Sequence, residues 1–168
     1  MIKLFLLCLI SGISGFSGTT WLTYTDNVNH FTMKYPETWT QKSGVNLIAF
    51  LSPRENEKDS FQENVNLLLQ DLSQQKMSLS QYTELTKKQI IDNFGASAIV
   101  STKPIIFAGQ QSEEFIYNMN YQGRQLKIRQ YCFIKNNLAY LFTYTAEPSQ
   151  YSKYESLAME IINSFKFS

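Results

Sequence analysis

Hydrophobic and polar residues alternate with period two over several short stretches of the chain, which is the pattern of half-buried β-strands. The stretch 31–35, Phe-Thr-Met-Lys-Tyr, alternates in this way and stops at Pro36, so it predicts a short strand that enters a turn. Apolar runs of strand length at 46–51 and 65–70 predict two further strands. The polar stretch 52–61 between them predicts an exposed loop.

Two other segments carry apolar residues at spacings of three and four, which is typical of an amphipathic helix. Ser78 and Gln81 have the spacing of a capping box and predict the start of the first helix. Gly95 predicts its end, because glycine adopts a positive φ at low cost. We expect Ser149, directly after Pro148, to cap the second helix. The expected buried stripes are Leu79, Tyr82, Leu85, Ile90 and Phe94 in the first helix, and Tyr151, Tyr154, Leu157, Ala158, Ile161, Ile162 and Phe165 in the second.

Three consecutive strand-like runs, at 112–121, 125–135 and 138–145, lie between the two helices. Asn136 and Asn137 join the last two runs, and asparagine tolerates the positive φ of a tight hairpin turn, so an antiparallel meander is predicted. The middle run is apolar on both faces, with Leu126, Ile128, Cys132 and Ile134 on one and Tyr131 and Phe133 on the other. The predicted fold class is therefore α+β, with a mostly antiparallel sheet covered by helices on both faces.

The first 17 residues have the pattern of a secretory signal peptide. Lys3 precedes an apolar run at 4–10, and small residues punctuate 11–17. We expect cleavage after Ser17, which leaves a single domain at 18–168. This domain is expected in the periplasm or an equivalent non-cytoplasmic compartment, and secretion is the alternative. The apolar run is shorter than the roughly 20 residues of a membrane span, so no transmembrane segment is predicted in the mature chain.

Composition argues against several classes of function. The 168 residues carry a formal net charge of +1, which provides no general attraction to nucleic acid. His30 is the only histidine, which excludes two-histidine zinc sites, and the chain has no GxSxG, GxGxxG or GxxxxGK motif. Cys132, the one cysteine left after cleavage, is expected in the core. We therefore predict no enzymatic activity, no catalytic residue and no metal-ligating residue.

Two groups of residues remain as binding candidates. Arg54, Lys58 and Asp59 lie in the expected loop and are candidates for contact with a partner, because binding residues concentrate on loops. The alternative is a site between the sheet and a helix, lined by side chains that combine an apolar ring with a hydroxyl. The tyrosines that would line this alternative site are Tyr117, Tyr121, Tyr131, Tyr140 and Tyr144.

The order of several short motifs resembles the PsbP family, the extrinsic domain of the photosystem II oxygen-evolving complex, and its bacterial relatives. The resemblance spans 21–167 and is carried mainly by Phe-Thr-Met-Lys-Tyr-Pro-Glu-Thr-Trp at 31–39, Phe-Leu-Ser-Pro at 50–53 and Glu-Asn-Val-Asn-Leu at 63–67. It implies an antiparallel sheet between helices. It also implies a non-enzymatic accessory role at a membrane protein complex, which in photosynthetic relatives aids the retention of calcium and chloride. No ion-binding residue is carried over to this chain, so calcium is implied by the resemblance alone.

Two functional hypotheses follow. The first is an exported, non-enzymatic accessory domain that docks on a membrane protein complex, or on another envelope protein, from the non-cytoplasmic side. The second is an exported carrier of a small ligand or metal ion, with its site between the sheet and a helix. An exposed apolar surface would favour docking, whereas a cavity lined by several of the five tyrosines would favour the carrier.

Overall fold

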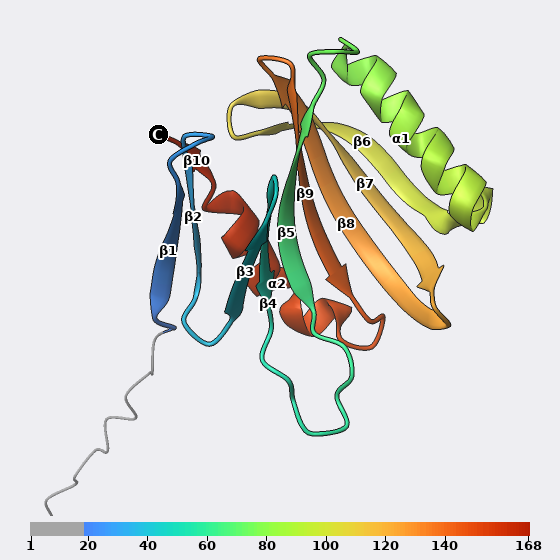
Figure 1. Cartoon of the computed structure of the whole chain (residues 1–168). Coiled ribbons are helices and arrows are strands. Elements are labelled where there is room, and N and C mark those ends of the chain that lie inside the picture. The colour runs from blue at the N-terminus through green and yellow to red at the C-terminus, as the bar shows by residue number, and fades with distance from the viewer. Residues whose placement is uncertain (1–18) are drawn as a thin grey trace, which may run out of the picture.

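Ten strands and two α-helices make up the described part of the chain, residues 19–168 of the computed structural model (Figure 1). The expected signal peptide at 1–17 lies outside the described residues. The strands form one sheet of seven and one of three, and every pairing is antiparallel. Neither helix of this part has the length and hydrophobicity that a membrane-spanning helix needs.

The larger sheet has the strand order β3-β4-β5-β9-β8-β7-β6. Asn136 and Asn137 have φ values of 54° and 59° and form the turn between β8 and β9, which confirms the predicted meander. Gly123, with φ 81°, lies in the turn between β7 and β8. The strands are β3 (Thr40–Gly44), β4 (Leu47–Leu51), β5 (Asn64–Asp71), β6 (Ile99–Phe107), β7 (Gln110–Tyr121), β8 (Arg124–Lys135) and β9 (Leu138–Ala146).

The smaller sheet has the order β1-β2-β10, with β1 (Trp21–Asp26), β2 (Phe31–Pro36) and β10 (Lys166–Phe167). Strand β2 confirms the strand predicted at 31–35. The chain turns directly after it, where the Trp39 N–H donates to the Pro36 carbonyl at 2.9 Å. This turn buries the Trp39 side chain in the core.

Helix α1 (Leu79–Phe94) begins and ends where the sequence predicts. The Ser78 hydroxyl accepts from the Gln81 N–H at 3.2 Å, and the Gln81 side chain accepts from the Ser78 N–H at 2.8 Å, which completes the capping box. Gly95 ends the helix with φ 87°, and its N–H donates to the Ile91 carbonyl at 2.8 Å. A short 3₁₀ turn, Ala96–Ala98, leads into β6.

Helix α2 (Tyr151–Asn163) begins one residue later than a Ser149 cap requires, so that prediction is wrong. Its N-cap is Gln150, without a side-chain capping hydrogen bond. The Glu147 carbonyl accepts from the N–H groups of both Gln150 and Tyr151 at 2.9 Å, so Ser149 lies inside the preceding turn.

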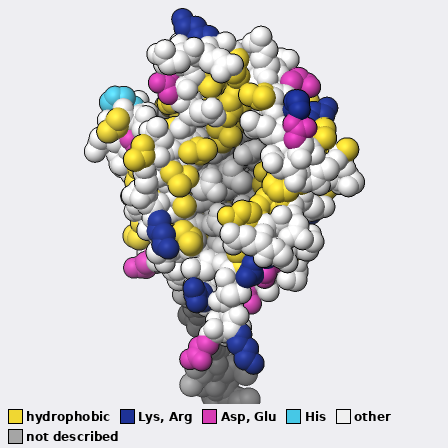
Figure 2. Space-filling view, turned by 45° about the vertical axis from the view of Figure 1, so that its right-hand side comes forward, with side chains coloured by type: hydrophobic (Ala, Val, Ile, Leu, Met, Phe, Trp, Pro, Cys, Tyr) yellow, Lys and Arg dark blue, Asp and Glu magenta, His cyan; other side chains and the backbone are white. Residues whose placement is uncertain are grey.

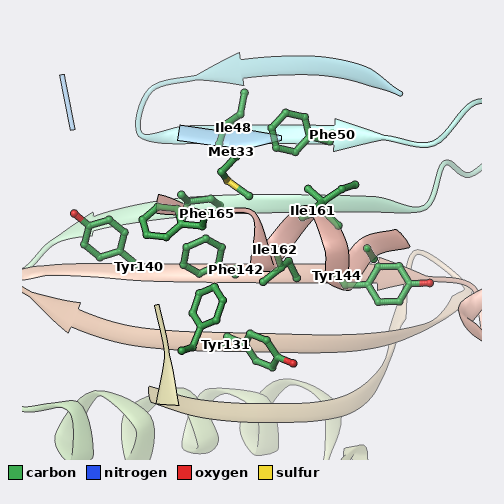
Figure 3. Close-up of a cluster of buried hydrophobic side chains, with 14 of the residues drawn as sticks. Met33, Ile48, Phe50, Tyr131, Tyr140, Phe142, Tyr144, Ile161, Ile162 and Phe165 are labelled. Atoms are coloured by element: carbon green, nitrogen blue, oxygen red, sulfur yellow. The ribbon is translucent and has the colours of Figure 1, made fainter. Parts of the chain in front are cut away.

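The main hydrophobic core lies between α2, the smaller sheet and one face of the larger sheet. Phe142, Ile162 and Phe165 point toward one another in its middle (Figure 3), with 4.9 Å between the ring centroids of Phe142 and Phe165. A second core lies on the opposite face of the larger sheet, where α1 packs mainly on β7 and β8. Its members include Tyr82, Phe115 and Cys132.

The two cores confirm that β8 is apolar on both faces, because Tyr131 and Phe133 belong to the first core and Cys132 to the second. The expected α+β class, with mostly antiparallel sheets and two helices, is therefore correct. The prediction that helices cover both faces of the sheet is confirmed only in part. On the face of the larger sheet that carries α1, Leu47 and Leu68 stay exposed within the described structure.

Candidate functional site

The first candidate site is a crevice of about 500 Å³ between the tips of two hairpins, which we call the hairpin-tip crevice. One wall is the turn between β1 and β2, and the other is the turn between β3 and β4. Strand β5 contributes Leu67 and Leu69 to its lining. The remaining lining residues come from the two hairpins: Tyr24, Thr25, Asp26, Asn27, Val28, Asn29, Phe31, Ser43, Gly44, Val45, Asn46, Leu47 and Ile48.

Hydrogen bonds within the first turn fix its shape. The Asp26 carboxylate accepts from the N–H groups of Val28 at 2.9 Å and Asn29 at 2.8 Å. Burial by itself would raise the pKa of Asp26, but the hydrogen bonds from Asn29 and Val28 outweigh it and leave the pKa below its ordinary value. His30 follows with φ 54°, exposed in the turn.

A valine stands at the outermost position of each turn, where polar residues are usual. Val28 is 84% exposed and Val45 is 92% exposed. Neither side chain belongs to either hydrophobic core, so both stay free for contact with a partner. The two valines therefore present exposed apolar side chains beside a crevice whose lining is mixed, with Asp26, Asn27 and Asn29 among its polar residues.

The second candidate site is a groove of about 310 Å³ between α1 and the larger sheet, which we call the α1 groove. It is lined by Leu68, Gln70, Tyr82, Thr86, Gln89, Ile90, Asn93, Phe94, Tyr117, Gln130 and Leu141. The space-filling view shows the surface hollowed near its centre, with hydrophobic side chains gathered along both sides of the hollow (Figure 2).

Two phenols in the α1 groove stay protonated at neutral pH. Burial raises the pKa of Tyr82 and of Tyr117 to about 12. The Tyr82 hydroxyl donates to the Gln70 side-chain oxygen at 2.8 Å, which ties α1 to β5. These groups can donate or accept hydrogen bonds but provide no charge at neutral pH.

Outside the two hollows, a network of charged side chains connects β6, β7, β8 and α2. The Glu114 carboxylate is buried and forms ion pairs with Arg129 at 2.6 Å and with Lys103 at 3.1 Å, while Arg129 also pairs with Glu155 at 3.0 Å. Burial favours a higher pKa for Glu114, but Arg129 and Lys103 outweigh it and lower the pKa. Arg124 likewise pairs with Glu147. The two arginines of the meander, Arg124 and Arg129, thus pair with nearby carboxylates.

The loop candidates are exposed except for Asp59, which shapes the loop itself. The Asp59 carboxylate accepts from the N–H groups of Glu55 at 3.0 Å and Phe61 at 3.1 Å. These hydrogen bonds lower the pKa of Asp59. Arg54 and Lys58 project from the same loop into solvent, so the structure leaves these two side chains accessible.

The five candidate tyrosines are not brought together. Tyr117 lies in the α1 groove, and Tyr121, on the same strand, is exposed outside it. Tyr131, Tyr140 and Tyr144 belong to the core on the opposite face of the sheet. A single cavity lined by all five is therefore not formed, because the sheet separates them.

The Cys132 thiol is poorly placed to act as a nucleophile. Cys132 is buried, and burial raises the pKa of its thiol to about 12, so the thiolate that a nucleophile requires is scarce at neutral pH. Within residues 19–168, no group of three or more His, Cys, Asp or Glu side chains is placed to hold a metal ion. The calcium that the resemblance implies therefore has no carboxylate cluster of this kind in the described part.

The sequence-based reasoning missed both hollows as such. The signal for the hairpin-tip crevice was a valine inside each of two turns rich in asparagine, glycine and serine. The signal for the α1 groove was a set of carboxamides, Gln70, Gln89, Asn93 and Gln130, on segments that otherwise bury apolar residues.

Two antiparallel sheets and two helices define an α+β protein, and its two candidate sites are hollows in the surface. The chain belongs to the PsbP-like protein family, whose model matches residues 13–167. No curated protein matches the sequence.

Solved structures share the fold at low sequence identity. Cyanobacterial PsbP from Synechocystis has a TM-score of 0.61 and 13% identity, over 95% of this chain and 99% of that one. LpqN of Mycobacterium tuberculosis, described as involved in cell envelope biogenesis, has a TM-score of 0.61 and 7% identity, over 89% and 91%. A Pseudomonas aeruginosa protein of unknown function, described as a putative regulator, has a TM-score of 0.59 and 17% identity, over 83% and 94%. At these identities the similarity establishes the fold alone.

Proposed function

We propose that this protein is an exported, non-enzymatic accessory domain that docks on a membrane protein complex from the non-cytoplasmic side. Membership of the PsbP-like family and the signal-peptide pattern of 1–17 support this proposal. The observation that carries it is the hairpin-tip crevice, with Val28 and Val45 exposed at its two walls. An apolar side chain of the partner would fill the crevice while the two valines lose their exposed surface.

Burial of one exposed valine contributes about 1.5 kcal/mol to binding, which is about a ten-fold change in affinity. A glutamate at the same position would instead place a charge in the interface and incur a desolvation cost. Both turns are exposed, so we expect Val28→Glu and Val45→Glu to leave the fold unchanged. Ile106→Glu is the matched control, because Ile106 is 72% exposed on β6, which does not line the crevice.

The experiment is affinity capture with the full chain from the envelope fraction of its host, followed by mass spectrometry. We expect one membrane complex to be enriched by the parent chain and by Ile106→Glu, and at least ten-fold less by the Val28→Glu/Val45→Glu double variant. Capture at low salt preserves weak charged contacts. Retention of nothing at low salt would refute docking, and equal retention by the double variant would refute the crevice as the docking surface.

A second candidate function is that of a small-ligand carrier with its site between the sheet and a helix. The observation that favours it is the α1 groove, which lies between these elements and includes Tyr117. The two functions use different surfaces, because the groove and the hairpin-tip crevice share no lining residue. Titration of the full chain with small ligands tests the carrier function directly.

A further inference from the structure

The lining of the α1 groove mixes polar and apolar side chains and carries no charge. Among the described residues that line it, none is an acid, a lysine, an arginine or a histidine. Thr86, Gln89, Asn93 and Phe94 come from one face of α1. The charged pair of α1, Lys88 and Asp92, bond each other and do not line the groove. The groove is therefore a neutral surface in which hydrogen-bonding side chains lie beside apolar ones.

Several hydrogen-bonding groups of the groove have no partner in the described structure. Gln70 accepts from Tyr82 and keeps its NH₂ group available. Gln130 donates to the Thr143 hydroxyl at 3.2 Å and keeps its side-chain oxygen. Asn93 donates to the Gln89 backbone carbonyl at 2.8 Å and also keeps its side-chain oxygen. Donors and acceptors thus lie on both the helix wall and the sheet wall of the groove.

These features argue against charged and against purely apolar ligands. A charged ligand would lose hydration on entering the groove and would find no opposite charge in the lining. A purely apolar ligand would cover carboxamides without bonding them, which leaves polar groups desolvated and unpaired. The groups that match the lining are neutral and can both donate and accept hydrogen bonds, as a hydroxyl does.

We propose that the α1 groove binds a neutral, polyhydroxylated ligand, namely an uncharged mono- or disaccharide. The carboxamides bond its hydroxyls, and the half-exposed ring of Phe94 covers its C–H face. The groove volume of about 310 Å³ lies at the lower end of small-molecule sites and suits one or two sugar rings. This inference rests on the carrier function and is independent of docking.

The test is NMR titration of the ¹⁵N-labelled full chain with four probes. Glucose and cellobiose are the neutral sugars, glucose 6-phosphate is the charged counterpart of glucose, and N-acetyl-triglycine amide is a neutral peptide. We expect the sugars to shift amide signals of α1, β7 and β8 around the groove, with a Kd for cellobiose at or below about 10 mM. The phosphate and the peptide should bind at least ten-fold more weakly.

Two variants and two matched controls assign the site. Tyr117→Phe and Gln130→Leu should each raise the Kd for cellobiose about ten-fold, because each removes a hydrogen-bonding group from the groove. Tyr121→Phe on the same strand and Gln41→Leu on β3 lie outside the groove and should leave the Kd unchanged. Far-UV circular dichroism and the ¹⁵N spectra show that each variant is folded.

Each remaining outcome counts against the proposal in a defined way. Binding of the phosphate or the peptide without binding of the sugars would keep the carrier function and overturn the ligand class. Absence of any shift with all four probes would overturn the saccharide proposal, while docking through the hairpin-tip crevice would stand. Sugar binding that Tyr117→Phe and Gln130→Leu do not weaken would overturn the assignment to this groove.

Discussion

The ion pair between Arg129 and Glu114 gives the sharpest prediction about stability. The Glu114 side chain is 2% exposed and that of Arg129 is 21% exposed, so the pair is largely removed from water. Arg129→Met keeps most of the side-chain volume but leaves a buried carboxylate without its main partner. Removing one member of such a pair costs about 3 kcal/mol, because the other charge stays desolvated.

The assay is equilibrium unfolding in urea at neutral pH. With an m-value of about 2 kcal/mol per molar, the midpoint should fall by about 1.5 M. Lys103, the other partner of Glu114, is 58% exposed, and Lys103→Met is therefore the matched control. We expect this control to cost less than about 1 kcal/mol, because water screens an exposed partner.

The effect of pH has a definite sign. In the native parent chain the pKa of Glu114 is lowered, so this carboxylate stabilises the fold at neutral pH and loses that contribution as the pH falls through its native pKa. In Arg129→Met, burial becomes the dominant influence and raises the pKa. The deficit of the variant should therefore shrink as the pH falls below neutral, because the buried carboxyl then takes up a proton at a higher pH than an ordinary glutamate does.

Two results would refute this reasoning. One is a loss below about 1 kcal/mol at neutral pH, which would place the pair among weak surface pairs. The other is a deficit that stays constant on acidification. The double variant Glu114→Gln/Arg129→Met removes the buried charge and should recover more than half of the stability that Arg129→Met loses.

Three further outcomes are expected. Ser78→Ala should destabilise the protein by about 1 kcal/mol in urea unfolding, because it removes the α1 cap, while Ser80→Ala next to it should change stability by less than about 0.5 kcal/mol. Phe142→Ala should cost about 4 kcal/mol in the same assay, because this side chain is fully buried against Phe165, and a loss under about 1 kcal/mol would contradict the core described above. Cys132 should resist a thiol reagent at about pH 8 in the native state and react fully in denaturant, whereas rapid native labelling would contradict its burial.

The elements that could be predicted from sequence are those whose signal is local. The capping box of Ser78, the stop at Gly95 and the paired asparagines of the β8–β9 turn each act within a few residues, and all three predictions are confirmed. The alternation in β8 likewise places Tyr131 and Cys132 on opposite faces, as expected. The prediction of a Ser149 cap is wrong because Ser149 lies inside a turn closed by the Glu147 carbonyl, and no local sequence pattern predicts this turn.

The missed strands are at edges or depend on distant partners. Strand β3 is exposed throughout, so it carries no apolar pattern, and β6 contains Pro104, which weakens any strand prediction. The two residues of β10 are a strand only because β2 pairs with them. The candidate tyrosines are not brought together because strand pairing decides which face Tyr117 and Tyr140 share with their neighbours.

The two hollows lie close together because one strand contributes to both. Successive side chains of β5 point to opposite faces of the sheet, so Leu67 and Leu69 line the hairpin-tip crevice while Leu68 and Gln70 line the α1 groove. A substitution on β5 that moves its backbone therefore affects both sites and cannot separate docking from ligand binding. Val28 and Val45 belong to the crevice alone, and Tyr117 and Gln130 to the groove alone. A change at any of these four positions alters one hollow and leaves β5, the shared strand, unchanged. A loss of partner capture can therefore be assigned to the crevice, and a loss of sugar binding to the groove.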